Sequence, residues 1–389
     1  MKTFISKVKK PEFSYEFPQE KEKILFFDIE TTGLSKEVSS LYLIGAMYYD
    51  NTEESFMEIQ WFADRHRDEK TMLLAFLELL EKYDYLYHFN GKTFDIPYVL
   101  FKCRRYEIRL SEHAEKILKD DSGKKSIDIL ARVRKLKKFL SLEKCSQTSL
   151  EKFLRLDRKD QFSGGELIPV YAEYMQLRLL EPEKAEALEK LLLLHNHDDV
   201  EMMLSVCAIL SYEVPLKETS LSFLSAQIAG QNETKHLLLS FSYPCEVPKE
   251  IRSIRYYPET DSLTATLELK GNLGFLHLPL YTGTLKYFFP DYKNYYYLPA
   301  EDTAIHKSVS EFVKKEHRKQ ATASTCYTKR EGVFFPSLIP KTKAENSSQT
   351  PLFFRNYKEK PAFYELPKDL NHTDRFFTKI IEEQLTMFL

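Results

Sequence analysis

The chain has 389 residues, of which 43% are hydrophobic and 29% are charged, and its formal net charge is −2 at pH 7. This length and apolar content are enough for a large core and predict two domains. No run approaches the roughly 18 apolar residues of a membrane span, and the charged, proline-interrupted N-terminus is unlike a signal peptide. The small net charge excludes nucleic-acid binding driven by overall charge, so any electrostatic attraction to nucleic acid must come from local basic patches.

Cysteines and glycines exclude several further classes. The five cysteines are scattered, odd in number and form no CxxC pair. This pattern is typical of a reducing compartment, so we expect a cytoplasmic protein without a disulfide frame or a cysteine-based zinc site. The 11 glycines form neither a GxGxxG nor a GxxxxGK[ST] motif, which excludes the phosphate-binding loops of those types.

A buried strand with two acids comes first in the predicted order of elements. Residues 1–22 are a polar lead-in without a recognisable element, and residues 24–34 form an apolar run that Thr-Thr-Gly ends. Side chains alternate along a strand, so Asp28 and Glu30 lie on one face. Two such charges about 4 Å apart repel by roughly 4 kcal/mol at an effective dielectric near 20. A bound divalent cation would relieve that repulsion.

The following segments predict a mixed α/β domain. Residues 41–49 and 54–62 indicate a hairpin, residues 70–83 a helix, residues 85–89 a strand, and residues 126–130 another short strand. Between the last two strands, a helix is expected to begin near Asp95. Helical spacing then dominates residues 131–213, with a loop at 161–166 and a long final helix over 182–211. These elements favour a sheet covered by helices on both faces.

The residue pattern changes after residue 215. Residues 251–290 alternate aromatic and β-branched residues with turns, which predicts strands, and residues 303–322 and 375–385 show helical spacing. The polar segment 341–351 is typical of a loop. We therefore expect a lead-in over 1–22, an α/β domain over 23–214, and a β-rich region with a terminal helix over 215–389.

Three segments of the first domain carry matching chemistry. Asp95 begins a helix after a strand, and His195 and Asp199 lie four residues apart on one helix face. If they converge with the two acids of the first strand, the set of Asp28, Glu30, Asp95 and Asp199 suits two Mg²⁺ or Mn²⁺ ions and phosphodiester hydrolysis. His195 could then take the proton from the attacking water. Asp198 is a fallback ligand.

These segments resemble the three motifs of the DEDD superfamily of 3′–5′ exonucleases. They read Asp-Ile-Glu-Thr-Thr-Gly-Leu, Phe-Asn-Gly-Lys-Thr-Phe-Asp-Ile-Pro and His195 followed by Asp199. Together with Ser-Ile-Asp-Ile-Leu at 126–130 and the two tyrosines at 171 and 174, they resemble the YprB-type ribonuclease H-like family. The resemblance implies a ribonuclease H-like fold and removal of nucleotides from 3′ ends, with the four carboxylates as metal ligands. Relatives with this four-residue spacing usually carry tyrosine at the position of His195, and histidine-type relatives place their base where Leu194 stands.

Alternative functions share this sequence pattern. A non-catalytic nucleic-acid-binding protein with a ribonuclease H-like fold is one, and a structure-specific endonuclease is another. Both DNA and RNA remain open as substrates. We expect nucleic-acid contacts from Thr31, Leu34 and Asn90 in the first two motifs. A basic helix over 131–140 adds Arg132, Arg134, Lys135, Lys137 and Lys138, whose phosphate contacts would depend on salt.

The second region adds three weaker patterns. Residues 286–297 interleave aromatic residues with lysines, which is typical either of β-core or of base stacking. Lys314, Lys315, Arg318 and Lys319 predict a second basic helical patch. At the C-terminus, Gln384, Leu385, Met387 and Phe388 resemble the peptide by which bacterial DNA-processing enzymes dock on the sliding clamp. The same residues also fit the core-facing stripe of a terminal helix.

Overall fold

The computed structural model describes residues 1–160, 162–216, 221–231, 235–260, 262–339, 350–370 and 373–388. It divides into two compact units. The first comprises Met1–Lys137 and Leu142–Tyr212, and the second comprises Lys138–Ser141 and Glu213–Leu389. Within these described ranges, no helix is both long and apolar enough to cross a membrane.

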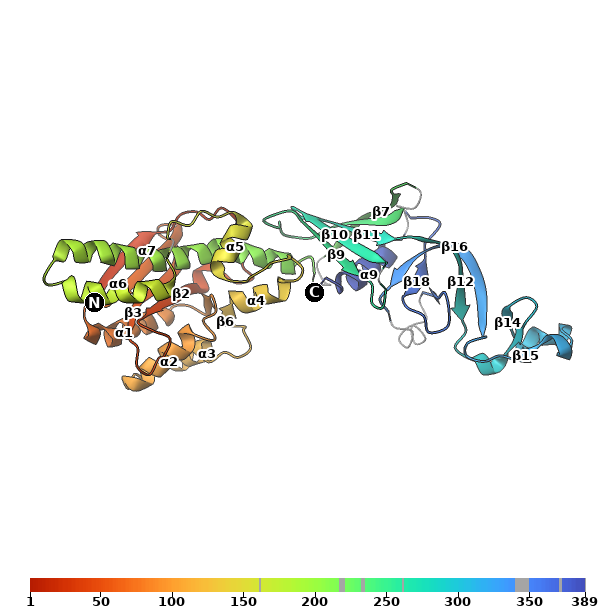
Figure 1. Ribbon diagram of the computed structural model, residues 1–389, viewed down its shortest axis with the longest axis horizontal. Helices are drawn as coiled ribbons and strands as arrows, with labels where there is room; N and C mark the ends of the chain where they lie inside the picture. Colours follow the sequence, from red (N-terminus) through yellow and green to blue (C-terminus); the bar gives the residue numbers. More distant parts are fainter. Residues whose placement is uncertain are drawn as a thin grey trace. The chain divides into compact units, whose positions relative to one another are not determined.

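The first unit is built on a six-stranded mixed sheet in the order β1-β4-β3-β2-β5-β6. Figure 1 labels β2, β3 and β6 of this sheet. The pairs β1–β4, β4–β3 and β3–β2 are antiparallel, which confirms the predicted hairpin of β3 and β4. The pairs β2–β5 and β5–β6 are parallel. The strands are β1 (Lys2–Lys7), β2 (Ile24–Thr31), β3 (Leu41–Asp50), β4 (Ser55–Phe62), β5 (Tyr85–His88) and β6 (Ser126–Asp128). The lead-in thus contributes the edge strand β1, which no sequence pattern predicts.

Helices cover both faces of this sheet, as predicted. The ring of Phe27 on β2 stacks on Phe76 of α1 at 5.1 Å between centroids, whereas Asp28 points to the opposite face and accepts a hydrogen bond from Asn196 of α7. The helices are α1 (Glu69–Leu80), α2 (Asp95–Arg105), α3 (Glu112–Leu118), α4 (Ile129–Leu136), α5 (Gln147–Leu154), α6 (Gly164–Leu177) and α7 (Pro182–Val206). Alternation along β2 therefore sends Asp28 toward α7 and Phe27 toward α1.

Several predicted boundaries in this unit are wrong. The predicted strand over 126–130 ends at Asp128, because the Asp128 side chain caps α4 by accepting a hydrogen bond from the Ala131 N–H at 3.2 Å. The predicted loop over 161–166 begins at Gln161, outside the described residues, but from Gly164 onward it is helix α6, which Ser163 and Glu166 close with a capping box. The final helix ends at Val206 and continues as a 3₁₀ turn, Cys207–Glu213.

The described residues of the second unit form three antiparallel sheets, in the orders β7-β8-β11-β10-β9, β12-β16-β18-β17 and β14-β13-β15. This confirms the β-rich prediction. The bounds are β7 (Ser222–Ala229), β8 (His236–Ser242), β9 (Ile251–Tyr256), β10 (Thr264–Lys270), β11 (Leu273–Pro279), β12 (Tyr281–Phe288), β13 (Tyr295–Leu298), β14 (Thr303–His306), β15 (Lys319–Gln320), β16 (Tyr327–Ser337), β17 (Leu352–Phe353) and β18 (Ala362–Glu365).

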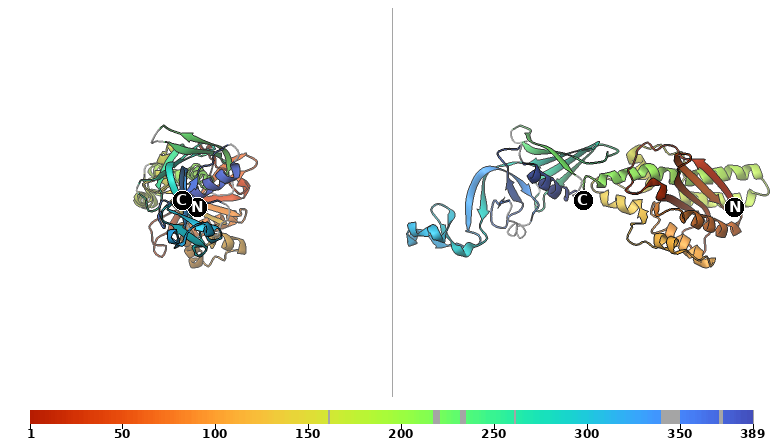
Figure 2. Two further views of the ribbon diagram at one scale, coloured as in Figure 1. Left: turned by 90° about the vertical axis from the view of Figure 1, so that its right-hand side faces the viewer. Right: turned by 180° about the vertical axis from the view of Figure 1, so that it is seen from behind.

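One helix of the second unit is confirmed and another is wrong. Helix α9 (Asp374–Leu385) packs against β7 through the stacked rings of Phe377 and Phe223, 5.6 Å apart. Figure 2 shows the backbone from two further sides, with α9 in dark blue. The predicted helix over 303–322 is instead β14, two 3₁₀ turns and β15. Its ends pair with the tyrosine-rich strand β13 and bury Ala304 and Ala321 in a small core, so strand pairing overrides the helical spacing. Of the loop predicted over 341–351, residues 341–349 lie outside the described residues.

Candidate active site

The end of β2 places two acids under helix α7. Asp28 lies opposite Gly45 of β3 in the antiparallel register. A Cβ at Gly45 would overlap the side-chain amide of Asn196, so the glycine lets α7 approach the sheet closely here. The Asn196 amide donates to Asp28 Oδ2 at 3.0 Å. Two residues further along β2, Glu30 is 7% exposed and points to the same side.

The other two predicted carboxylates come from the beginning of one helix and the middle of another. Asp95 is the first residue of α2, is 4% exposed, and accepts a hydrogen bond from the backbone N–H of Ile29 at 3.2 Å. This bond holds Asp95 against the β2 residue that separates Asp28 from Glu30. Asp199 lies on α7, four residues after His195. All the predicted acids therefore come from the three elements that the sequence indicated.

His195 faces two of these acids. Its Nε2 lies 3.6 Å from Glu30 Oε1 and 3.4 Å from Asp199 Oδ2. Ligand atoms of Glu30, His195 and Asp199 all lie within 4.8 Å of one another, close enough to share a metal ion. The opposite ring nitrogen, Nδ1, lies 2.6 Å from Asp160 Oδ2, and such a carboxylate partner orients a histidine and selects its tautomer.

Burial and mutual repulsion raise the pKa values of the three innermost acids. Loss of solvent is the largest cause in each case. The pKa of Asp28 is raised well above its ordinary value, with Asp95, Glu30 and Asp199 as further contributors. The pKa of Glu30 is likewise raised well above its usual range, and that of Asp95 is raised to about 7 although backbone hydrogen bonds oppose the shift. The site therefore holds more negative charge than its protein surroundings compensate.

Arg158 is a site residue that the sequence analysis did not single out. It stands in the charged run Asp157-Arg158-Lys159-Asp160, which is typical of an exposed loop. Its guanidinium donates to Asp199 Oδ1 at 2.7 Å, to Asp160 Oδ2 at 3.3 Å and to Glu151 Oε1 at 3.2 Å. Arg158 thus balances Asp199 and lowers the pKa of Glu30 against the raising effects. Asp160, which orients His195, was missed for the same reason.

The fallback ligand Asp198 belongs to a different group of side chains. Its Oδ2 accepts the backbone N–H groups of Lys159 at 3.0 Å and Asp160 at 2.7 Å. Its potential metal partners are His197 and Glu201, not the four acids. Asp198 therefore supports the loop that carries Arg158 and Asp160.

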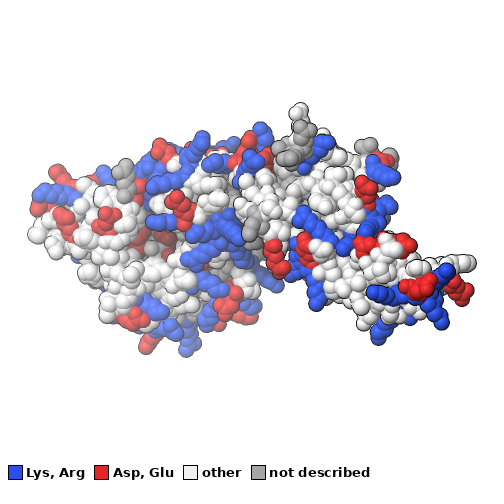
Figure 3. All heavy atoms as spheres, turned by 45° about the vertical axis from the view of Figure 1, so that its right-hand side comes forward, with Lys and Arg blue, Asp and Glu red and all other residues white. Residues whose placement is uncertain are grey.

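The residues predicted to contact nucleic acid differ in accessibility. Leu34 is 86% exposed and Thr31 is buried, while Asn90 adopts a positive φ of 64° in the turn after β5 and donates its N–H to Asp128. The basic helix is shorter than predicted. Helix α4 ends at Leu136, with Arg132 half-buried and the other basic side chains exposed, and Lys137 and Lys138 follow it. Figure 3 shows clusters of Lys and Arg on one face, with Asp and Glu scattered between them.

In the second region, part of the aromatic and lysine-rich segment contributes to a small core. Phe289 and Tyr295 stack at 4.6 Å and pack against the small core around Ala304. Lys314, Lys315, Arg318 and Lys319 lie on a 3₁₀ turn and the start of β15, so the predicted basic helix is wrong.

The interpretation of the C-terminus as a clamp-binding peptide is contradicted by burial. Gln384, Leu385 and Phe388 are 0%, 2% and 1% exposed, and Met387 is half-buried. The Gln384 amide donates to Pro336 O at 3.0 Å and its Oε1 accepts from Tyr257 at 2.6 Å. A docking peptide must be accessible, and this one forms the core-facing stripe of α9 and the turn that follows.

Comparisons with known proteins show what the chain is similar to. No curated protein matches the chain. Similar solved structures include the family B DNA polymerase of the archaeon Pyrobaculum calidifontis, at 14% identity and a TM-score of 0.40 over 72% of this chain and 36% of the polymerase. E. coli exonuclease I in complex with a dT13 oligonucleotide matches at 13% identity and a TM-score of 0.27, over 63% of this chain and 54% of that chain. The chain thus spans about a third of the polymerase and just over half of the exonuclease. Residues 25–211 match the family model of the RNase H superfamily, so this part of the chain is similar to that superfamily and has a ribonuclease H-like fold.

Proposed function

We propose that the first unit is a metal-dependent nuclease that hydrolyses nucleic-acid phosphodiester bonds from 3′ ends. The observation that carries this proposal is the grouping of half-buried Asp28 with buried Glu30 and Asp95, with the pKa of each carboxyl raised by lost solvent and by neighbouring acids. Such a cluster is unfavourable for folding alone. It suits hard divalent cations, which bind carboxylate oxygens and remove the repulsion.

Mg²⁺ or Mn²⁺ ions fit the donor set of Asp28, Glu30, Asp95 and Asp199. When bound, two such ions would stabilise the attacking and leaving oxygens of the phosphate. Around them, the chain supplies a largely buried setting, because most of β2 is buried and the N–H of Ile29 holds Asp95. Gly164 borders the same place, since a Cβ there would lie 3.7 Å from Glu30 Oε2 and 3.8 Å from His195 Nε2.

His195 has the geometry of a proton acceptor for the attacking water. Its Nδ1 is held by Asp160 and its Nε2 points toward the acids. A carboxylate on one nitrogen stabilises the imidazolium that forms when the other nitrogen takes a proton. Asp160 is accordingly a positioning residue, and Arg158 in turn holds Asp160 and Asp199.

A labelled substrate tests the proposal. Purified protein should shorten a 3′-labelled single strand of DNA or RNA with Mg²⁺ or Mn²⁺ and stay inactive with a chelator. Asp28→Ala should abolish the reaction, whereas Asp121→Ala should not, because the Asp121 side chain is fully exposed and lies outside the site. A wild-type protein that binds both nucleic acids but cleaves neither with either metal would make the unit a binding protein.

A circular single strand distinguishes the remaining alternative. An exonuclease needs an end and leaves the circle intact, whereas a structure-specific endonuclease linearises a circle that contains its target structure. Cleavage of the circle that Asp28→Ala abolishes would keep the metal site and replace the 3′-end activity.

A further inference from the structure

A second histidine–carboxylate group lies on another face of α7, beside a cavity. His197, Asp198 and Glu201 offer ligand atoms that all lie within 4.8 Å of one another. His197 Nε2 is 3.3 Å from Glu201 Oε2, and its Nδ1 is hydrogen-bonded to the carboxylate of Glu58 on β4. This is the arrangement of a metal-binding histidine whose outer nitrogen a carboxylate holds.

Two buried carboxylate oxygens of this group have no partner among the described residues. Asp198 is 1% exposed, and its Oδ1 accepts no hydrogen bond although its Oδ2 accepts two. Glu58 is also 1% exposed, and its Oε1 is unpartnered as well. A buried, charged oxygen without a donor is costly, and a cation would satisfy it where an anion would not.

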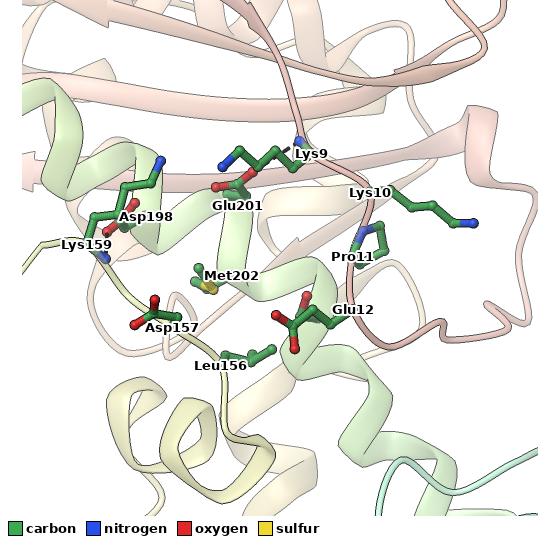
Figure 4. Close-up of a pocket in the computed structure, with 11 residues that line it drawn as sticks. Lys9, Lys10, Pro11, Glu12, Leu156, Asp157, Lys159, Asp198, Glu201 and Met202 are labelled. Carbon is green, nitrogen blue, oxygen red and sulfur yellow. Dashed lines mark hydrogen bonds between the residues drawn. The ribbon is translucent and has the colours of Figure 1, made fainter.

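A cavity borders Asp198 and Glu201 of this group, and His197 is not among its lining residues. It has a volume of about 250 Å³ and lies between α7, the residues after β1 and the loop before Asp160 (Figure 4). Because a water molecule takes about 30 Å³ of liquid, a hydrated cation fits. Its lining includes the carboxylates of Glu12, Asp157, Asp198 and Glu201 and the ammonium groups of Lys9, Lys10 and Lys159. Along this lining, the four carboxylates outnumber the three ammonium groups by one.

We propose that His197, Asp198 and Glu201 form a second divalent-cation site, separate from the catalytic acids, that takes a zinc-type ion. One imidazole nitrogen and two carboxylates suit Zn²⁺, whereas the mainly carboxylate catalytic cluster suits Mg²⁺ or Mn²⁺. Binding displaces the proton from His197 Nε2, as ligation by histidine requires. Glu58 then keeps the Nδ1 proton and orients the ring.

The site would act on the catalytic loop through Asp198. The same carboxylate that offers Oδ1 to the cation holds the N–H groups of Lys159 and Asp160 with Oδ2. Asp160 orients His195. Zinc at this site therefore fastens the segment that carries Arg158 and Asp160, which gives it a structural role next to the active site.

Zinc titration in an inactive background tests this. The full chain with Asp28→Asn and Glu30→Gln removes two catalytic ligands and cannot confuse zinc binding with turnover. Isothermal titration should show zinc binding that His197→Gln abolishes and Glu201→Gln weakens. Glu58→Gln, which changes the orienting partner, should cost about 10–100-fold in affinity. Glu186→Gln, on the same helix but exposed, is the matched control and should bind as the background does.

Hydrogen exchange supplies an independent readout. Zinc should slow exchange at the amides of Lys159 and Asp160 in the background, and not in its Glu201→Gln derivative. Zinc binding that is equal in the background, His197→Gln and Glu201→Gln would overturn the proposal, as would no binding at all. Where His197→Gln fails to fold, the near-isosteric Glu201→Gln decides. Because no assay here uses cleavage, a failed nuclease activity and a failed zinc site are distinguishable.

Discussion

Two faces of helix α7 carry histidine–carboxylate groups only two residues apart, and they balance their charges differently. On one face, His195 looks toward Glu30 and Asp199, and the neighbouring acids raise one another's pKa values. On the other, hydrogen bonds from His197 to Glu201 and Glu58 raise the pKa of His197 to about 10. The first group has too little positive charge without metal, and the second is balanced by a proton. The group around His195 therefore favours cation binding strongly. At the group around His197, a cation must compete with the proton.

The largest expected effect comes from replacing His195, which should slow cleavage without preventing metal binding. His195→Ala should lower the cleavage rate by about 10²–10⁴-fold, because a positioned base is lost, while binding of Mn²⁺ to the carboxylates persists. Single-turnover cleavage and metal titration measure the two. His66→Ala, an exposed histidine outside both groups, should match wild type. A His195→Ala enzyme of normal rate would remove His195 from the mechanism.

Arg158 tests the charge deficit directly. Arg158→Gln leaves Asp199, Asp160 and Glu151 without their shared cation. Breaking a buried ion pair by removing one partner costs about 3–5 kcal/mol, so urea denaturation of the metal-free variant should show a lower free energy of unfolding. Added Mn²⁺ should recover more stability in the variant than in wild type. Equal stability of both proteins without metal would show that Arg158 does not balance the site.

The pH dependence of stability should reflect the crowded acids. The pKa of Asp95 is about 7 in the folded protein against an ordinary 3.8, so the folded state retains a proton that the unfolded chain releases. The free energy of unfolding of the metal-free protein should therefore fall as pH rises from about 4 through about 7. Asp95→Asn should flatten that decline, and saturating Mg²⁺ should reduce it. Urea denaturation at several pH values measures both, and a wild-type stability that rises across this range contradicts the assignment.

The smallest expected effect concerns the basic residues of α4, and it tests whether they bind the substrate independently of the two groups on α7. Arg134→Ala and Lys135→Ala on α4 change exposed side chains and should leave the melting temperature unchanged. If each contacts a phosphate, each should weaken binding and reduce the salt dependence of log K by about 1. Fluorescence anisotropy at several salt concentrations measures this. An unchanged salt dependence in both variants would place the nucleic acid elsewhere.

The clustered acids of the first unit were predictable because each has a local signature. Asp28 and Glu30 end a buried apolar run, Asp95 follows a strand and a turn, and His195 and Asp199 have helical spacing. These patterns depend on residues close in the chain. Arg158 and Asp160 were not predictable, because a charged run in a loop does not indicate which acids it will meet. Asn196 was hidden for a similar reason, since its contact with Asp28 depends on the space at Gly45 across the sheet.

The two interpretations of the C-terminus show the same limit. Gln384, Leu385 and Phe388 fit a docking peptide and an amphipathic helix equally well, and burial against the second unit's strands decided for the helix. Over residues 303–322, helical spacing was overridden by pairing with β13. The sequence by itself determined the acids, their elements and the α/β order of the first unit, because buried strands and helix starts are local patterns. Tertiary structure alone decided the partners of those acids and the fate of ambiguous segments, because contacts between distant residues depend on the complete fold.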